Sequence, residues 1–438
     1  MLTLLGSPHR YCDGVSRRSF LQLGGLALGG LSLPQLLQAE QKKGQSHRSV
    51  IMVYLSGGLA HQDTFDLKPN APREVRGEFN PIATSVPGFQ IGELLPRLAR
   101  CAHQYSVIRS VVGQIDEHSS FQSTVGFPMG TTQREGKPHF GSVVARMQGP
   151  VDPVIPPFVD LFPTMQHRPY NSPNAGHLGR AAQGVKVDGQ DMATMRLQGR
   201  TLAELDDRKR LLAQVDRMKR DADAMGNMDA SYRRAFDVLT SSKMLEALDI
   251  SREPASVRDR YGRGSTRHLG DGAPMWNDQL LMARRLVEAG ARVVTVAYGF
   301  WDTHGQNFRH LRQHLPLFDQ GISALIEDIY ARGLDRSCTV VVWGEFGRTP
   351  KINKDAGRDH WARVNSALLA GGGMKVGQVI GSTDSTAAAA KEHPIHYRDV
   401  LATIYHNLGI DSHGMVYDVS NRPNLILPTD AQPIARLL

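Results

Sequence analysis

The chain has 438 residues, of which 41% are hydrophobic and 21% are charged, and it carries a formal net charge of +8 at pH 7. This composition predicts a globular protein with a large hydrophobic core and excludes a disordered chain. The positive charge is modest and spread along the sequence, without a basic block interleaved with aromatic residues, so no nucleic-acid binding is expected.

The first 39 residues have the pattern of an export signal. Arg17 and Arg18 precede an uncharged stretch rich in Gly, Leu and Ala from Leu23 to Leu37, and Ala39 precedes Glu40. This order is typical of a signal peptide, and paired arginines are typical of the twin-arginine (Tat) type. The alternative is an uncleaved anchor, but the stretch is Gly-rich and short for a membrane span. We expect export through the Tat translocase, a periplasmic or secreted location and no stable membrane span.

After a polar linker at 40–48, the sequence predicts a single α/β domain over 49–438, with two helices inserted near 201–248. Apolar, β-branched runs predict strands at 50–55, 105–111, near Phe158, at 293–297, at 339–343, and on both sides of a glycine turn within 363–380. Apolar spacings of three and four predict further helices at 92–103, 276–289, 310–332 and 397–408. Because the apolar runs read as strands buried on both faces, the central sheet should be mostly parallel.

Three of the predicted strands stop abruptly at polar clusters. The clusters are, in chain order, Ser56-Gly57-Gly58 continuing to His61 and Asp63, then Asp302-Thr303-His304, then Gly344-Glu345-Phe346-Gly347-Arg348. Parallel sheets place their ligands just beyond the carboxyl ends of the strands. We therefore expect the three clusters to meet in one crevice.

Two acid–imidazole pairs are the strongest candidates for metal ligands. Asp302 and His304 lie two residues apart in a loop after a strand, and such donors suit zinc, iron or manganese. The alternative is an aspartate that accepts backbone hydrogen bonds and a histidine packed under Trp301. In the second pair, adjacent side chains of extended backbone point apart. His360 is therefore expected in the site, with Asp359 orienting it or serving a neighbouring ion.

Other side chains near the strand ends have two readings each. Arg348 offers a planar fork that suits phosphate, sulfate or carboxylate, but an arginine beside Glu345 is at least as often a structural ion pair. Hydroxyl groups are nucleophiles only beside a base or a metal, and most such residues form turns. The hydroxyl candidates are Ser56, Ser119, Ser120 and Thr124.

Several motifs resemble those of one family of exported bacterial proteins. They are Tyr54-Leu-Ser-Gly-Gly-Leu-Ala-His-Gln-Asp-Thr-Phe-Asp66, Glu74-Val-Arg-Gly-Glu-Phe79, Leu95-Pro-Arg-Leu98, Ile108-Arg-Ser110, Asp302-Thr-His304, Gly344-Glu-Phe-Gly-Arg-Thr-Pro350, Gly357-Arg-Asp-His-Trp361, Gly371-Gly-Gly373 and Gly381-Ser-Thr-Asp384. On these motifs the chain resembles the DUF1501 family, whose activity is undefined and whose fold is similar to the alkaline phosphatase and sulfatase superfamily. The resemblance implies a three-layer α/β/α sandwich of that type with a mostly parallel central sheet.

The superfamily resemblance also implies a metal-dependent hydrolase of phosphate or sulfate esters, with two metal sites at strand ends and a hydroxyl or modified cysteine nucleophile. Asp302 and His304 fall where one metal's ligands are expected, and His360 falls where a late histidine is expected. Ser119 or Ser120 falls near the nucleophile loop.

Two positions depart from the superfamily pattern. Ser56-Gly57-Gly58 replaces an aspartate after the first strand, which leaves Asp63 as a substitute ligand, and Glu345-Phe346 replaces an Asp-His pair. These changes put a full two-metal site in doubt.

Two functions of different class follow from the sequence. The first is a hydrolase of an anionic ester, for example in a sulfated or phosphorylated polysaccharide. Its divalent zinc, manganese, iron or calcium ion would be held among Asp302, His304, His360, Asp359, Asp63 and His61, with Glu345 assisting and Arg348 steadying the anion. The second is a non-catalytic secreted binding or cell-surface protein on a degenerate alkaline-phosphatase-like fold.

Overall fold

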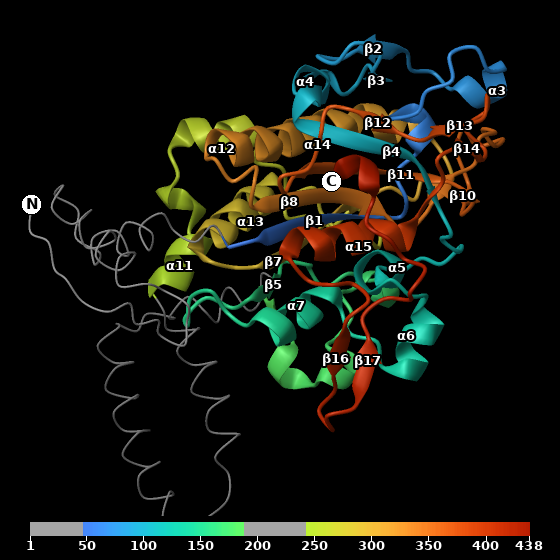
Figure 1. The fold of residues 1–438 in the computed structure, drawn as a ribbon. Coiled ribbons are helices and arrows are strands. Elements are labelled where there is room, and N and C mark those ends of the chain that lie inside the picture. Colours follow the sequence, from blue (N-terminus) through green and yellow to red (C-terminus); the bar gives the residue numbers. More distant parts are fainter. Residues whose placement is uncertain (1–46, 188–241) are drawn as a thin grey trace, which may run out of the picture. The chain divides into compact units, whose positions relative to one another are not determined.

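A nine-stranded sheet forms the centre of the protein, whose computed structural model describes residues 47–187 and 242–438. The order across the sheet is β12-β4-β11-β8-β1-β7-β5-β6, of which the strands from β12 to β5 are labelled in Figure 1, and β15 pairs with β4. The strands are β1 (Ser49–Ser56), β4 (Tyr105–Val112), β5 (Phe158–Asp160), β6 (Val185–Lys186), β7 (Val293–Phe300), β8 (Cys338–Gly344), β11 (Asn365–Gly371), β12 (Val379–Ile380) and β15 (Ile395–His396). The expected leader, most of the linker and residues 201–241 of the expected insertion lie outside the described residues.

Eight of these nine strands run in the same direction. β1 is parallel to β7 and β8, and β5 is parallel to β6 and β7. β11 is antiparallel to both β8 and β4, whereas β12 and β15 are parallel to β4. β4 therefore points the same way as β1, and the carboxyl ends of β1, β4, β7 and β8 share one edge of the sheet.

Helices cover both faces of the sheet and make three layers (Figure 1). On one face, α13 (Asn277–Ala289) and α14 (Asn307–Ala331) pack against Ile51 and Val53 of β1. On the other face, α7 (Phe140–Gln148) and α15 (Tyr397–Leu408) pack against Val50 and Met52. One strand supplies both cores because successive side chains point to opposite faces. The predicted three-layer α/β/α sandwich with a mostly parallel sheet is confirmed.

Shorter elements surround the sheet. The helices are α3 (Arg73–Arg76), α4 (Pro96–Arg100), α5 (Phe121–Val125), α6 (Met129–Glu135), α11 (Ser242–Leu248) and α12 (Ala255–Tyr261). The two-stranded ladders pair β2 (Pro81–Ala83) with β3 (Gln90–Gly92), β9 (Gly347–Arg348) with β10 (His360–Trp361), β13 (Ser382–Thr383) with β14 (Ala390–Glu392), and β16 (Met415–Tyr417) with β17 (Pro423–Leu425). No helix within 47–187 or 242–438 is long and apolar enough to cross a bilayer.

The helix predicted at 92–103 differs most from the structure. This segment contains the end of β3, the five-residue α4 and a short 3-10 helix. Pro96 explains the late start, because proline fits the first turn of a helix but not its interior. The N-terminus of α4 is capped from a distant element, since the Asp319 carboxylate of α14 accepts hydrogen bonds from the backbone amides of Arg97 and Leu98 at 2.8 Å.

A buried histidine at the start of α7 gives the fold a dependence on pH. The His139 ring is stacked between Phe140 and Phe158, its Nδ1 accepts a hydrogen bond from the amide of Gly141, and its Nε2 has no partner. Burial lowers its pKa to about 3. The unfolded chain therefore takes up a proton below about pH 6.5, whereas the folded protein does so only near pH 3.

We expect His139 to remove about 2 kcal/mol of stability between pH 7 and pH 5, since each pKa unit corresponds to about 1.4 kcal/mol. The substitution His139→Asn keeps a hydrogen-bond acceptor for the helix but does not titrate, so the variant should lose less stability over this interval than the parent. Urea unfolding at the two pH values measures the difference. Equal losses in both proteins would show that this histidine does not carry the effect.

Candidate metal centre

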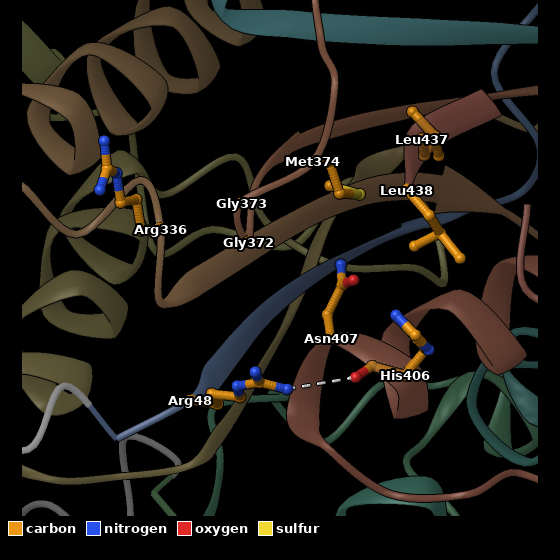
Figure 2. A pocket seen from close by; sticks show the side chains of 9 residues that line it. All are labelled: Arg48, Arg336, Gly372, Gly373, Met374, His406, Asn407, Leu437 and Leu438. Atoms are coloured by element: carbon orange, nitrogen blue, oxygen red, sulfur yellow. Dashed lines mark hydrogen bonds between the residues drawn. The ribbon is translucent and has the colours of Figure 1, made fainter. Parts of the chain in front are cut away.

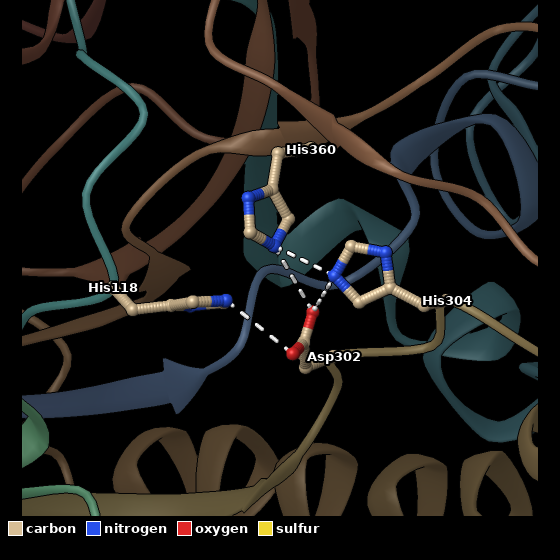
Figure 3. A group of neighbouring side chains, drawn as sticks. All are labelled: His118, Asp302, His304 and His360. Carbon is tan, nitrogen blue, oxygen red and sulfur yellow. Dashed lines mark hydrogen bonds and ion pairs between the residues drawn. The ribbon is translucent and has the colours of Figure 1, made fainter.

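Four side chains from three separate segments meet at the carboxyl edge of the sheet (Figure 3). His118 lies in the loop that follows β4, and Asp302 and His304 lie in the loop that follows β7. His360 begins β10, which pairs with β9 directly after the end of β8, so that His360 lies opposite Arg348. One coordinating atom from each of the four side chains lies within 4.8 Å of the others.

The Asp302 carboxylate is the centre of this cluster. Its Oδ1 lies 3.0 Å from Nε2 of His304 and 3.3 Å from Nε2 of His360, and its Oδ2 lies 3.3 Å from Nε2 of His118. Nε2 of His304 and Nε2 of His360 are themselves 2.9 Å apart. Three imidazole nitrogens and a carboxylate thus converge on one small volume.

Each of the three histidines has a carboxylate against its other ring nitrogen. Nδ1 of His304 lies 2.7 Å from Asp359, and Nδ1 of His360 lies 2.7 Å from Asp116. Nδ1 of His118 lies 3.2 Å from Glu345. An ionised carboxylate only accepts hydrogen bonds, so when His304 and His360 are neutral their protons lie on Nδ1 and their Nε2 lone pairs are directed into the cluster.

The lone pairs of His304 and His360 therefore face each other at 2.9 Å. Two such lone pairs repel unless a proton or a metal cation lies between them. Metal–nitrogen bonds of about 2.0–2.1 Å place neighbouring ligand atoms about 2.8–3.4 Å apart in octahedral or tetrahedral geometry, and the four separations of 2.9–3.3 Å given above match this spacing. The four side chains fit a single divalent ion.

The chemistry of the donors narrows the choice of ion. Imidazole nitrogen is a ligand for zinc, iron, manganese and related transition metals, whereas calcium and magnesium prefer oxygen ligands. A set of three imidazoles and one carboxylate fits the first group, so calcium, one of the four ions that the sequence left open, suits this donor set least.

Neighbouring charged groups shift the pKa values of Asp302 and His118 in opposite directions. Burial alone would raise the pKa of Asp302, but hydrogen bonds from His118 and His360 and the charge of Arg348 hold it well below its usual range. Burial alone would lower the pKa of His118, but the carboxylates of Asp302 and Glu345 outweigh it and raise the pKa to about 9. Asp302 therefore stays ionised, as a ligand requires.

The family model described as "Protein of unknown function (DUF1501)" matches residues 47–438. The chain belongs to the DUF1501 family. The predicted family membership is thus confirmed, and none of the curated proteins compared with the chain matches it.

Solved structures similar to this DUF1501 protein include three hydrolases. The PsFucS1 sulfatase from Pseudoalteromonas sp. is 12% identical, with a TM-score of 0.38 over 89% of this chain and 72% of that one. The phosphonate monoester hydrolase SpPMH from Silicibacter pomeroyi is 11% identical, with a TM-score of 0.37 over 88% and 76%. The alkaline phosphatase from the Antarctic bacterium TAB5 is 11% identical, with a TM-score of 0.27 over 82% and 96%. These similarities are too weak to transfer an activity to the chain.

Arg348 of the DUF1501 protein has a different role from the anion clamp suggested by its sequence. Its guanidinium group is fully buried and donates to Asp302 and to the backbone carbonyls of Gly57, Gly58 and Arg358. These contacts occupy four of its five N–H groups, so little donor capacity is left for a substrate. Arg348 holds Asp302 in place and joins the loops that follow β1 and β7.

The glycines after β1 permit this arrangement. Gly57 has a φ of +96°, and a Cβ at this position would lie 2.4 Å from the backbone nitrogen of Asp302. The Gly57 amide also donates a 2.8 Å hydrogen bond to Glu345, which is buried and receives a second one from the hydroxyl of Tyr54. Glu345 is thereby fixed against His118 rather than exposed to a substrate.

The structure does not bring His61 and Asp63 to the cluster. Asp63 is buried and forms a bidentate ion pair with Arg358, with hydrogen bonds of 2.7 and 2.8 Å. It also accepts a hydrogen bond from Asn307. The His61 ring is buried with Nε2 against the carbonyl of Ala387, and burial lowers its pKa. Both residues hold the loop after β1 in place.

Neither predicted serine faces the cluster. The hydroxyl of Ser119 donates to Glu117 and that of Ser120 donates to the carbonyl of Asn171, and both residues are fully buried. The sequence suggested that Asp359 orients its neighbour His360. In the structure Asp359 contacts the cluster through His304 instead.

Two further residues complete the cluster, His118 and Asp116, and neither was among the predicted site residues. Both lie in the polar Asp116-Glu117-His118 segment, which follows the strand predicted at 105–111. Because parallel strands place ligands beyond their carboxyl ends, the position of this segment was a signal that could have identified them.

A pocket of about 320 Å³ lies at the other end of the sheet (Figure 2). Its lining includes Arg48, which precedes β1, and Gly372, which follows the reversed strand β11. The pocket is therefore at the amino edge of the parallel strands and separate from the His-Asp cluster.

Proposed function

We propose that this DUF1501 protein is a metal-dependent hydrolase of phosphate or sulfate esters, with its ion held by His118, Asp302, His304 and His360. The observation that carries the proposal is the pair of Nε2 atoms 2.9 Å apart whose Nδ1 partners are both carboxylates. A bound divalent ion would polarise an oxygen of the ester and lower the pKa of a nucleophile.

The contacts of the remaining residues suggest how the site would act. His304 is the most exposed ligand, with 47% of its side chain accessible against 18–22% for the other three, so a substrate would approach from its side. Arg348 and Glu345 keep Asp302 and His118 in position. Among the described residues, the serines considered as nucleophiles donate their hydroxyls elsewhere.

We infer that water is the nucleophile. Its oxygen would form a bond to phosphorus or sulfur and give up a proton. The bond from phosphorus or sulfur to the ester oxygen would break, and the departing oxygen would take up a proton to leave as the alcohol. Sulfated or phosphorylated polysaccharides are the natural substrates that we propose for such a site.

The test combines metal content with turnover. We expect the purified protein to hold about one transition-metal ion per chain and to hydrolyse aryl phosphates, aryl sulfates or phosphonate monoesters. Chelation should abolish turnover and re-addition of the ion should restore it. The variants Ser119→Ala and Ser120→Ala should keep activity within a few-fold of the parent. Loss of activity in either variant, with metal retained, would contradict water as the nucleophile.

Absence of a stoichiometric ion would contradict the hydrolase proposal. Metal binding without turnover on any of these esters would favour the second function, a non-catalytic secreted binding or cell-surface protein.

We also propose export by the twin-arginine route, on the basis of Arg17, Arg18 and the apolar stretch after them. Replacing both arginines with lysine should leave the protein in the cytoplasm, as measured by cell fractionation. Unchanged export of this variant would contradict the proposal.

A further inference from the structure

Two exposed carboxylates lie behind the histidines that face each other in the cluster. The side chain of Asp116 is 61% exposed and that of Asp359 is 51% exposed. Asp116 contacts Nδ1 of His360 and Asp359 contacts Nδ1 of His304, each at 2.7 Å. An exposed carboxylate gains little from a single surface contact, so these two contacts have small value for stability.

We infer that Asp116 and Asp359 are positioning residues that set the metal affinity of the site. The inference rests on the metal site of the proposed function and concerns residues that would not touch the ion. Each carboxylate holds one imidazole with the proton on Nδ1, which leaves the Nε2 lone pair directed at the place of the ion. Without the carboxylate the ring can rotate or carry its proton on Nε2, and that proton would occupy the position of the metal.

The two carboxylates should differ in how strongly they affect metal affinity. Asp359 is held by further contacts, because Asn353 donates to its Oδ1 at 3.1 Å and Thr349 accepts from its backbone amide at 3.0 Å. Among the described residues, His360 is the one recorded hydrogen-bond partner of the Asp116 side chain. Because a fixed acceptor orients a ring better than a mobile one, removal of Asp359 should weaken metal binding more than removal of Asp116.

Metal affinity, measured by competition with a chromogenic chelator, tests this inference with zinc and with manganese as probes. Asp116→Ala and Asp359→Ala should each weaken binding about 10- to 100-fold, the usual effect of an outer partner of a metal-bound histidine. Asp116→Asn and Asp359→Asn keep an oxygen acceptor, so these variants should lose less metal affinity than the alanine variants. The matched control is Asp355→Ala. Asp355 is an exposed aspartate of the loop that also contains Asp359, and among the described residues its side chain makes no hydrogen bond or ion pair with a histidine.

The readouts separate this inference from the proposed function. Unfolding in excess chelator should be the same for parent and variants, because the effect lies in metal binding and not in the fold. Affinities of the alanine variants within twofold of the parent, or an equal loss in Asp355→Ala, would overturn the inference and leave the hydrolase proposal intact. Weakened binding in a protein that hydrolyses no ester would support the inference and contradict the hydrolase. A parent that binds neither ion would overturn both.

Discussion

His360→Ala should abolish both metal binding and hydrolysis. The change removes one of four ligand atoms and also leaves Nε2 of His304 without the neighbour that lies 2.9 Å away. We expect metal affinity to fall by more than about 100-fold, the upper end of the effect of an outer-shell change. Activity at limiting metal should fall at least as far. Metal content after dialysis and turnover on aryl esters are the measurements.

His118→Ala should give the same result, because this histidine also directs Nε2 at Asp302. The control is His406→Ala, which removes an exposed histidine of the pocket at the opposite edge of the sheet. A His360→Ala or His118→Ala protein that retains a stoichiometric ion would show that the ion binds elsewhere. That result would end the proposal for this cluster.

Arg348→Met should destabilise the protein by about 3–5 kcal/mol, the usual cost of removing one partner of a buried ion pair. The substitution leaves Asp302 and three backbone carbonyls without their shared donor. Arg348→Lys should restore only part of the loss, because one ammonium group cannot reach acceptors arranged around a planar fork. Urea unfolding in excess chelator measures the fold alone, without the contribution of a bound ion.

Arg363→Met is the matched control for this prediction. Arg363 is an exposed arginine that lies over the ring of Trp361, two residues away in the chain. Exposed substitutions of this kind usually change stability by less than about 0.5 kcal/mol. If Arg348→Met unfolded at the same urea concentration as the parent, the buried arginine would not be the support that its contacts indicate.

The sequence predicts the sheet well because its signals are local. Long apolar runs such as 50–55 and 339–343 are strands buried on both faces, and the alternation of strands and helices leads directly to three layers. The prediction of one helix over 92–103 was wrong, because a single proline and a cap from the distant Asp319 determine where the helix begins. Sequence periodicity contains neither the position of that cap nor its partner.

The site is predictable in part, for the same reason. Asp302, His304 and His360 are predicted at one edge because they follow the ends of strands, and the structure brings their side chains together. The two interpretations of Arg348 cannot be separated from the sequence, because the choice depends on glycine carbonyls almost 300 residues earlier in the chain. The ion pair between Asp63 and Arg358 could not be predicted either, because it depends on how the folded chain packs and not on the spacing of the two residues in the sequence.

The four ligand positions are spread from residue 118 to residue 360, and β10 follows most of the sheet in sequence. An ion can therefore be captured only late, after nearly the whole domain has been synthesised and folded. If the chain is exported in its folded form, as the twin-arginine proposal implies, the choice of ion is made from the cytoplasmic supply before transport. In that case the metals abundant outside the cytoplasmic membrane would have no part in the selection, and the growth medium would influence the loaded ion only through the metal balance inside the cell.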